Sequence, residues 1–168
     1  MSNLIDLTLS ELVSKIKSKE VLSAEVTKAY VERSKSSKKL NTYVEETFAK
    51  ALENSKKFDS KPDFNKKLPG IPFAVKDLFC TKNVKTTAGS KILENFTPAY
   101  ESTVTKNLWD AGAILLGKLN CDEFAMGSSN ETSYFGNVIS PIDDNLVPGG
   151  SSGGSASALA AKLTPATI

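Results

Sequence analysis

Two short apolar runs on either side of an amphipathic segment constrain the fold of this chain more than any other feature. Residues 73–75 and 113–116 have the length of buried strands, whereas residues 103–111 carry apolar side chains at helical spacing. Gly112, directly after the helical pattern, is typical of a helix C-terminus. A strand, a helix and a second strand in this order are typical of parallel strands joined by a crossover helix. The sequence therefore predicts an α/β fold.

Helix signals dominate the N-terminal region. Thr8-x-x-Glu11 has the form of a capping box, and apolar residues follow it at helical spacing. Ser23 is the N-cap candidate of a second helix. The predicted elements are helices over residues 9–17, 23–35 and 47–58, and a short strand over residues 41–45.

Composition changes near residue 61. Residues 61–72 are rich in proline, lysine and asparagine, which is typical of a surface connection. We therefore expect an N-terminal helical segment over residues 1–60 and the first part of an α/β core over residues 61–168. A chain of 168 residues is long enough to bury one hydrophobic core, so we expect both parts to belong to a single domain.

A glycine–serine loop lies near the end of the chain. Residues 149–155 contain four glycines and three serines, and residues 156–162 follow with a small-residue helix pattern. Amides at the N-terminus of such a helix can point at an anion or a developing oxyanion. The alternative is a flexible linker, which the adjoining helix disfavours. Gly149-x-Ser151-x-Gly153 also matches a nucleophile elbow, but that motif needs a downstream histidine and the chain has none.

The absence of histidine excludes several classes of site. It removes Ser-His-Asp and Cys-His mechanisms and every histidine-ligated metal centre, and we predict no metal site. Lys76 ends an apolar segment, where most lysines reach solvent but where burial could prepare an amine to act as a base. Gly112-x-x-x-x-Gly117-Lys118 resembles a phosphate-binding loop, but Leu119 replaces the required hydroxyl residue. We therefore predict no nucleotide site in this chain.

Net charge and hydropathy limit the classes of binding partner and the cellular compartments to be expected. The formal net charge of +2 is too small to indicate binding to nucleic acid or an acidic membrane. No apolar stretch approaches the roughly 20 residues of a membrane-spanning helix. The first residues lack the basic and apolar regions of a secretory signal. We expect a cytoplasmic protein, with a mitochondrion or plastid as the alternative.

Two segments together resemble the amidase signature family. They are Leu68-Pro-Gly-Ile-Pro-Phe-Ala-Val-Lys76-Asp77 and Val147-Pro-Gly-Gly-Ser151-Ser152-Gly-Gly-Ser155-Ala156. The stretch from Cys121 to Gly136 and the run from Lys91 to Phe96 are similar to the branch of the family that serves tRNA-dependent amidotransferases. The resemblance covers essentially the whole chain. It implies an α/β fold with a central mixed β-sheet flanked by helices, here expected to be incomplete.

The family resemblance also implies a Ser–cis-Ser–Lys catalytic triad. Lys76 matches the lysine, and Ser151 matches the middle serine, whose preceding peptide bond is cis. The family's nucleophilic serine lies in a further Gly-Gly-Ser motif beyond Ile168, so we expect the chain alone to be inactive. Met126, Gly127 and Ser128 are implied to line a glutamine pocket. This interpretation requires that the amine of Lys76 and the hydroxyl of Ser151 meet inside the fold.

For a complete protein of this branch, the resemblance implies hydrolysis of glutamine through a glutamyl-enzyme ester. The ammonia would pass to a partner, the B subunit, which uses ATP and Mg²⁺ to amidate Glu-tRNA(Gln). The B subunit would contact most of the tRNA, and a small third protein, the C subunit, would complete a heterotrimer. No cofactor is expected to bind this chain. Two alternatives remain open at this point: an amidase of the same superfamily that acts on small amides, and a non-catalytic interaction module.

Overall fold

The computed structural model describes residues 4–168. The helices are α1 (Leu9–Lys17), α2 (Ser23–Ser36), α3 (Phe48–Ser60), α4 (Thr103–Asp110) and α5 (Gly153–Ala160), and the strands are β1 (Tyr43–Glu46), β2 (Pro72–Lys76) and β3 (Ile114–Leu119). Short 3-10 helices lie at Leu4–Asp6, Lys38–Leu40, Lys91–Leu93 and Glu123–Ala125. The predicted α/β fold and the type and order of its predicted elements are confirmed. Within residues 4–168, no helix has the length and apolar content needed to cross a bilayer.

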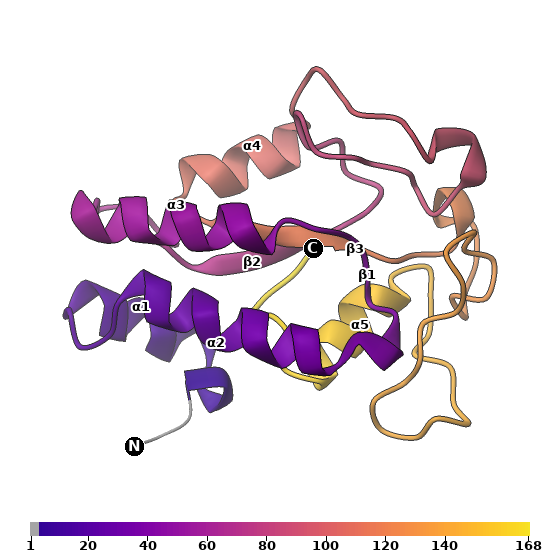
Figure 1. Ribbon diagram of the computed structural model, residues 1–168, viewed down its shortest axis with the longest axis horizontal. Coiled ribbons are helices and arrows are strands. Elements are labelled where there is room, and N and C mark those ends of the chain that lie inside the picture. Colours follow the sequence, from indigo (N-terminus) through magenta and orange to yellow (C-terminus); the bar gives the residue numbers. More distant parts are fainter. Residues whose placement is uncertain (1–3) are drawn as a thin grey trace.

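The three strands form a mixed sheet in the order β1-β3-β2. β2 and β3 are parallel and α4 is their crossover helix, as the sequence predicts, whereas β1 is antiparallel to β3. At the outer edge of β2, the amide of Lys76 donates to the carbonyl of Ile168 over 2.8 Å. The end of the chain therefore lies beside β2 (Figure 1).

Both faces of the sheet are covered (Figure 1). On one face, Ala74 of β2 packs in the larger core with buried residues of α1, α2 and α5. On the other face, Phe73 and Val75 pack against Leu108 and Trp109 of α4. Burial on both faces explains why residues 72–75 of β2 are all apolar. Because side chains alternate along a strand, Lys76 lies on the same face as Ala74, toward α5.

The loops that follow β2 and β3 gather at the carboxyl ends of these strands (Figure 1). Residue 89 is one point of contact between them, because the carbonyl of Gly89 accepts a hydrogen bond from the amide of Tyr134. The first turn of α5 reaches the same region, since the amide of Gly154 donates to the carbonyl of Asn120 over 3.0 Å. Three segments that are distant in sequence therefore meet at one end of the sheet.

One predicted N-cap residue and one predicted helix start are wrong. Ser23 is not an N-cap: Leu22 occupies that position, and the Ser23 hydroxyl donates instead to the carbonyl of Gly70. α5 begins at Gly153, three residues earlier than predicted, so the second half of the glycine–serine loop is helical. Two glycines weaken a helix locally, but here they allow it to approach other segments closely. A Cβ on Gly154 would lie 2.4 Å from the carbonyl oxygen of Asn120.

Gly154→Ala is expected to lower the free energy of unfolding by about 1–3 kcal/mol, the usual cost of overpacking. The added methyl group would meet backbone atoms of Asn120 and Thr42, which no rotamer change can move away. Chemical denaturation of the natural-length protein, meaning the full-length protein in which this sequence occurs, measures the effect. Ala156→Ser, at an exposed position of the same helix, is the control and should change stability by less than about 0.5 kcal/mol. Equal stability of the two variants would contradict the prediction.

Candidate active site

Lys76 and Ser151 meet at the carboxyl end of β2. The Nζ atom of Lys76 lies 2.7 Å from the Oγ atom of Ser151, although the two residues are 75 positions apart in the sequence. Lys76 is buried, with 6% of its surface exposed, because its side chain lies on the face of β2 that α5 covers. The contact that the sequence interpretation requires is therefore present.

Ser151 lies in the turn that leads into α5. The peptide bond between Gly150 and Ser151 is cis, as the family resemblance implies. Ser151 is half-buried, whereas Ser152, the N-cap residue of α5, is exposed. The Nζ atom of Lys76 also lies 2.8 Å from the Oγ atom of Ser152. Sequence reasoning missed this second contact, and the only available signal was the pair of adjacent serines.

The segment from Met126 to Ser128 lies next to this turn. A Cβ on Gly150 would lie 2.8 Å from the carbonyl carbon of Ser128, so the two backbones are in direct contact. Gly127 packs against the carboxyl group of Asp122, and its Cβ would lie 2.3 Å from Asp122 Cγ. Met126 is 79% exposed. The structure therefore brings Gly127 and Ser128 close to the turn that carries Ser151 and leaves most of the Met126 side chain in solvent.

A buried ion pair lies on the other face of the sheet from Lys76. The Nζ atom of Lys118 in β3 lies 3.7 Å from Asp77 Oδ1, and both side chains are fully buried. Lys118 also donates to the carbonyl of Phe79 over 2.7 Å and to the hydroxyl of Thr86 over 2.8 Å. Lys118 is thus a buried anchor for the loop that follows β2, and the residues before it form a strand rather than a phosphate cradle.

Burial shifts the pKa values of both members of this pair toward the neutral form. Burial lowers the pKa of Lys118 to about 8, and the nearby charge of Asp77 opposes that shift. Burial likewise raises the pKa of Asp77, against hydrogen bonds from the hydroxyl and amide of Thr87 and the charge of Lys118. Asp77 directly follows the catalytic candidate Lys76 in sequence, but sequence reasoning assigned neither Asp77 nor Lys118 a role in the site.

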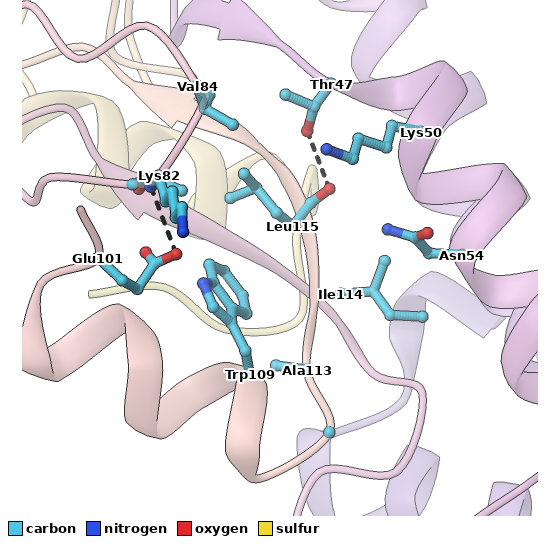
Figure 2. A pocket seen from close by; sticks show the side chains of 12 residues that line it. Thr47, Lys50, Asn54, Lys82, Val84, Glu101, Trp109, Ala113, Ile114 and Leu115 are labelled. Atoms are coloured by element: carbon cyan, nitrogen blue, oxygen red, sulfur yellow. Dashed lines mark hydrogen bonds between the residues drawn. The ribbon is translucent and has the colours of Figure 1, made fainter. Parts of the chain in front are cut away.

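A pocket of about 420 Å³ lies between α3, α4 and the start of β3 (Figure 2). Lys50 and Asn54 of α3 and Trp109 of α4 line it. Its β3 residues are at the beginning of that strand, whereas Lys76 pairs with Leu119 at the end. The pocket is therefore separate from the contact between Lys76 and Ser151. Within residues 4–168, no cluster of three or more His, Cys, Asp or Glu side chains is placed to hold a metal ion.

Comparison with known proteins gives a consistent family assignment. The sequence model of the family described as Amidase matches residues 25–168. The chain is 70% identical over its whole length to the A subunit of glutamyl-tRNA(Gln) amidotransferase from Pelagibacter ubique, and covers 35% of that protein. It is 54% identical over 97% of its length to the protein of the same name from Hyphomonas neptunium, again covering 35% of it. The chain thus spans about a third of the length of these relatives.

Solved structures agree with this assignment. The crystal structure of the A subunit of glutamyl-tRNA(Gln) amidotransferase from Thermotoga maritima matches with a TM-score of 0.81 at 33% identity, over 98% of this chain and 34% of that one. A fatty acid amide hydrolase matches with a TM-score of 0.90 at 24% identity, over 96% of this chain and 29% of that one, and shows the fold alone. Because the family model matches residues 25–168, which is most of its length, this chain belongs to the amidase family.

Proposed function

We propose that the protein is the glutaminase subunit of a tRNA-dependent amidotransferase, and that it hydrolyses glutamine to supply ammonia. The contact between Lys76 and Ser151 supports this function, because it provides an amine and a hydroxyl for acid–base chemistry in a chain without histidine. The names of its relatives indicate the reaction: both are amidotransferase subunits, and the chain is 70% and 54% identical to them.

In the proposed mechanism, Lys76 is the base and Ser151 the relay. Lys76 takes the proton of the Ser151 hydroxyl as Ser151 takes the proton of the nucleophilic serine, which the family resemblance assigns to a Gly-Gly-Ser motif outside this sequence. The activated serine attacks the side-chain amide of glutamine and forms a glutamyl ester. The same two groups return the proton to the departing nitrogen, which leaves as ammonia. Water then hydrolyses the ester.

Met126, Gly127 and Ser128 are proposed to contribute to the glutamine site. The contact between the backbones of Ser128 and Gly150 supports this role, because it places the segment one residue from Ser151. A substrate bound there would lie beside the relay hydroxyl. Ser151 is only half-buried, so part of its surface remains accessible.

The proposed partners follow from the names of the relatives. We propose a heterotrimer with the B and C subunits of the amidotransferase, in which the B subunit holds Glu-tRNA(Gln), uses ATP and Mg²⁺ and receives the ammonia. The net charge of +2 is compatible with tRNA contact through that partner rather than through this chain. No cofactor is assigned to this chain, and the proposed compartment is the cytoplasm, with a mitochondrion or plastid as the alternative.

Glutamine hydrolysis by the natural-length protein, assembled with the B and C subunits, tests this proposal. Ser151→Ala is expected to lower kcat by at least about 100-fold, because the relay to Lys76 is lost. Ser152→Ala is the matched comparison: it removes the other hydroxyl next to Lys76 and should have a much smaller effect. Full activity of Ser151→Ala would refute the assigned role.

Two further outcomes identify the alternative functions. Turnover of small aliphatic amides as fast as glutamine, without the two partner proteins, would indicate a general amidase. Absence of hydrolysis in the unsubstituted assembly would indicate a non-catalytic module.

A further inference from the structure

Asp122 carries a buried carboxylate in the loop that follows β3. Its side chain is fully buried, and none of the ion pairs found within residues 4–168 includes it. The carboxylate accepts hydrogen bonds from the amide of Asn130 at 3.0 Å, the hydroxyl of Thr132 at 2.9 Å and the amide of Thr132 at 3.3 Å. A buried charge that is held by neutral donors fixes the segment that supplies those donors.

The same residue also reaches the catalytic turn. The amide of Asp122 donates to the carbonyl of Ser151 over 3.2 Å. Its carboxylate lies between two glycines: a Cβ on Gly150 would be 2.1 Å from Asp122 Oδ2, and a Cβ on Gly127 would be 2.3 Å from Asp122 Cγ. Asp122 therefore contacts the segment proposed to bind glutamine on one side and the cis peptide of the relay serine on the other.

We propose that Asp122 is a positioning residue for glutamine hydrolysis, which holds residues 126–132 against the turn that carries Ser151. The inference rests on the proposed function and extends it to a residue that touches neither the substrate nor Lys76. Bound glutamine would contact the segment and the relay hydroxyl at the same time, so displacing the segment from the turn would weaken substrate binding and raise the KM. Asp122 bonds to both segments, so it sets the separation between them.

A carboxylate fits this role better than an amide. Both oxygens of Asp122 accept hydrogen bonds from the loop, one from Asn130 and the other from Thr132. An asparagine side chain has one acceptor oxygen, and its NH₂ group would face an N–H or O–H donor. Asp122→Asn therefore preserves the size of the side chain and breaks one of the two attachments.

Asp122→Asn in the natural-length protein, assembled with the B and C subunits, tests the inference. We expect the KM for glutamine to rise by at least about tenfold, the change that follows loss of a hydrogen bond to a charged group. A role in folding alone would lower the amount of active protein, and so the apparent kcat, without changing KM. A KM equal to that of the unsubstituted protein would overturn the inference.

Thr132 supplies a second, milder test in case Asp122→Asn does not fold. Thr132→Val removes the hydroxyl that donates to Asp122 and should raise the KM for glutamine by a smaller factor. Thr132→Ser keeps that hydroxyl and should restore the original KM. If the valine and serine variants have the same KM, the bond to Asp122 does not position the loop.

Asp144→Asn is the control, because Asp144 is an exposed aspartate whose ion pair with Lys39 spans 3.7 Å at the surface. It should retain the original kcat and KM. A different result would show that the proposed function itself is wrong. If the unsubstituted assembly does not hydrolyse glutamine, both proposals are overturned. An active Asp122→Asn protein with unchanged KM would overturn only the role of Asp122.

Discussion

Lys76→Met is expected to lower the kcat of glutamine hydrolysis by about 10³- to 10⁴-fold, the upper part of the range for loss of a general base. Lys76 is the only amine in contact with Ser151 among the described residues, and it also holds the Ser152 hydroxyl. The substitution therefore removes the proton acceptor and leaves both hydroxyls without their shared partner. Methionine has a similar length, so the buried position at the end of β2 remains filled.

Lys76→Arg separates the loss of a base from the loss of a positive charge. Arginine keeps the charge but remains protonated in proteins, so it cannot accept the proton of Ser151. Its activity should be as low as that of Lys76→Met. The measurement is the steady-state rate of ammonia release by the natural-length protein assembled with the B and C subunits. Lys162→Met, at an exposed lysine paired with Asp6, is the control and should be fully active. Substantial activity of Lys76→Arg would show that the amine is not the base.

Periodicity was sufficient to predict the βαβ unit. β2 and β3 are apolar runs that fit parallel strands, and α4 has a helical pattern that ends before a glycine at φ +97°. Periodicity could not predict the start of α5, because glycine has low helix propensity. Gly153 and Gly154 fit there because any side chain would clash with Asn130 and Asn120, respectively. The N-cap prediction for Ser23 was wrong because of another tertiary contact: its hydroxyl donates to the carbonyl of Gly70.

The candidate site was predictable only in part. Lys76 and Ser151 were identified through the family motifs, and their proximity depends on which face of β2 the lysine occupies. Asp122 and Lys118 are charged residues, and such residues are rarely fully buried. Nothing in the local sequence indicates that either one is buried. Their burial arises from the register of β3 with β2 and from the packing of the loops at the end of the sheet.

Lys118→Met is expected to lower the free energy of unfolding by about 3–5 kcal/mol, the usual cost of removing one member of a buried ion pair. The substitution leaves Asp77 charged and fully buried, 3.7 Å from where its cation had been. It also removes the donor that satisfies the carbonyl of Phe79 and the hydroxyl of Thr86. The loop after β2 then loses its side-chain attachment to β3, so activity should fall together with stability.

Chemical denaturation of the natural-length protein at several pH values provides the measurement. The pKa of Lys118 is about 8 when folded, below its ordinary value of 10.5, so the unfolded chain binds more protons between these values. The contribution of Lys118 to the free energy of unfolding therefore rises with pH across this range, and the methionine variant should lack that rise.

Two further variants show whether the unpaired, buried charge of Asp77 causes the loss of stability in Lys118→Met. Adding Asp77→Asn to Lys118→Met removes the unpaired charge and keeps an acceptor for Thr87, so part of the lost stability should return. Lys106→Met disrupts an exposed pair with Asp110 and should cost less than about 1 kcal/mol. If Lys118→Met is no more destabilising than Lys106→Met, the Asp77–Lys118 pair does not hold the carboxyl ends of β2 and β3 together, and the loop after β2 must be anchored by its backbone contacts alone.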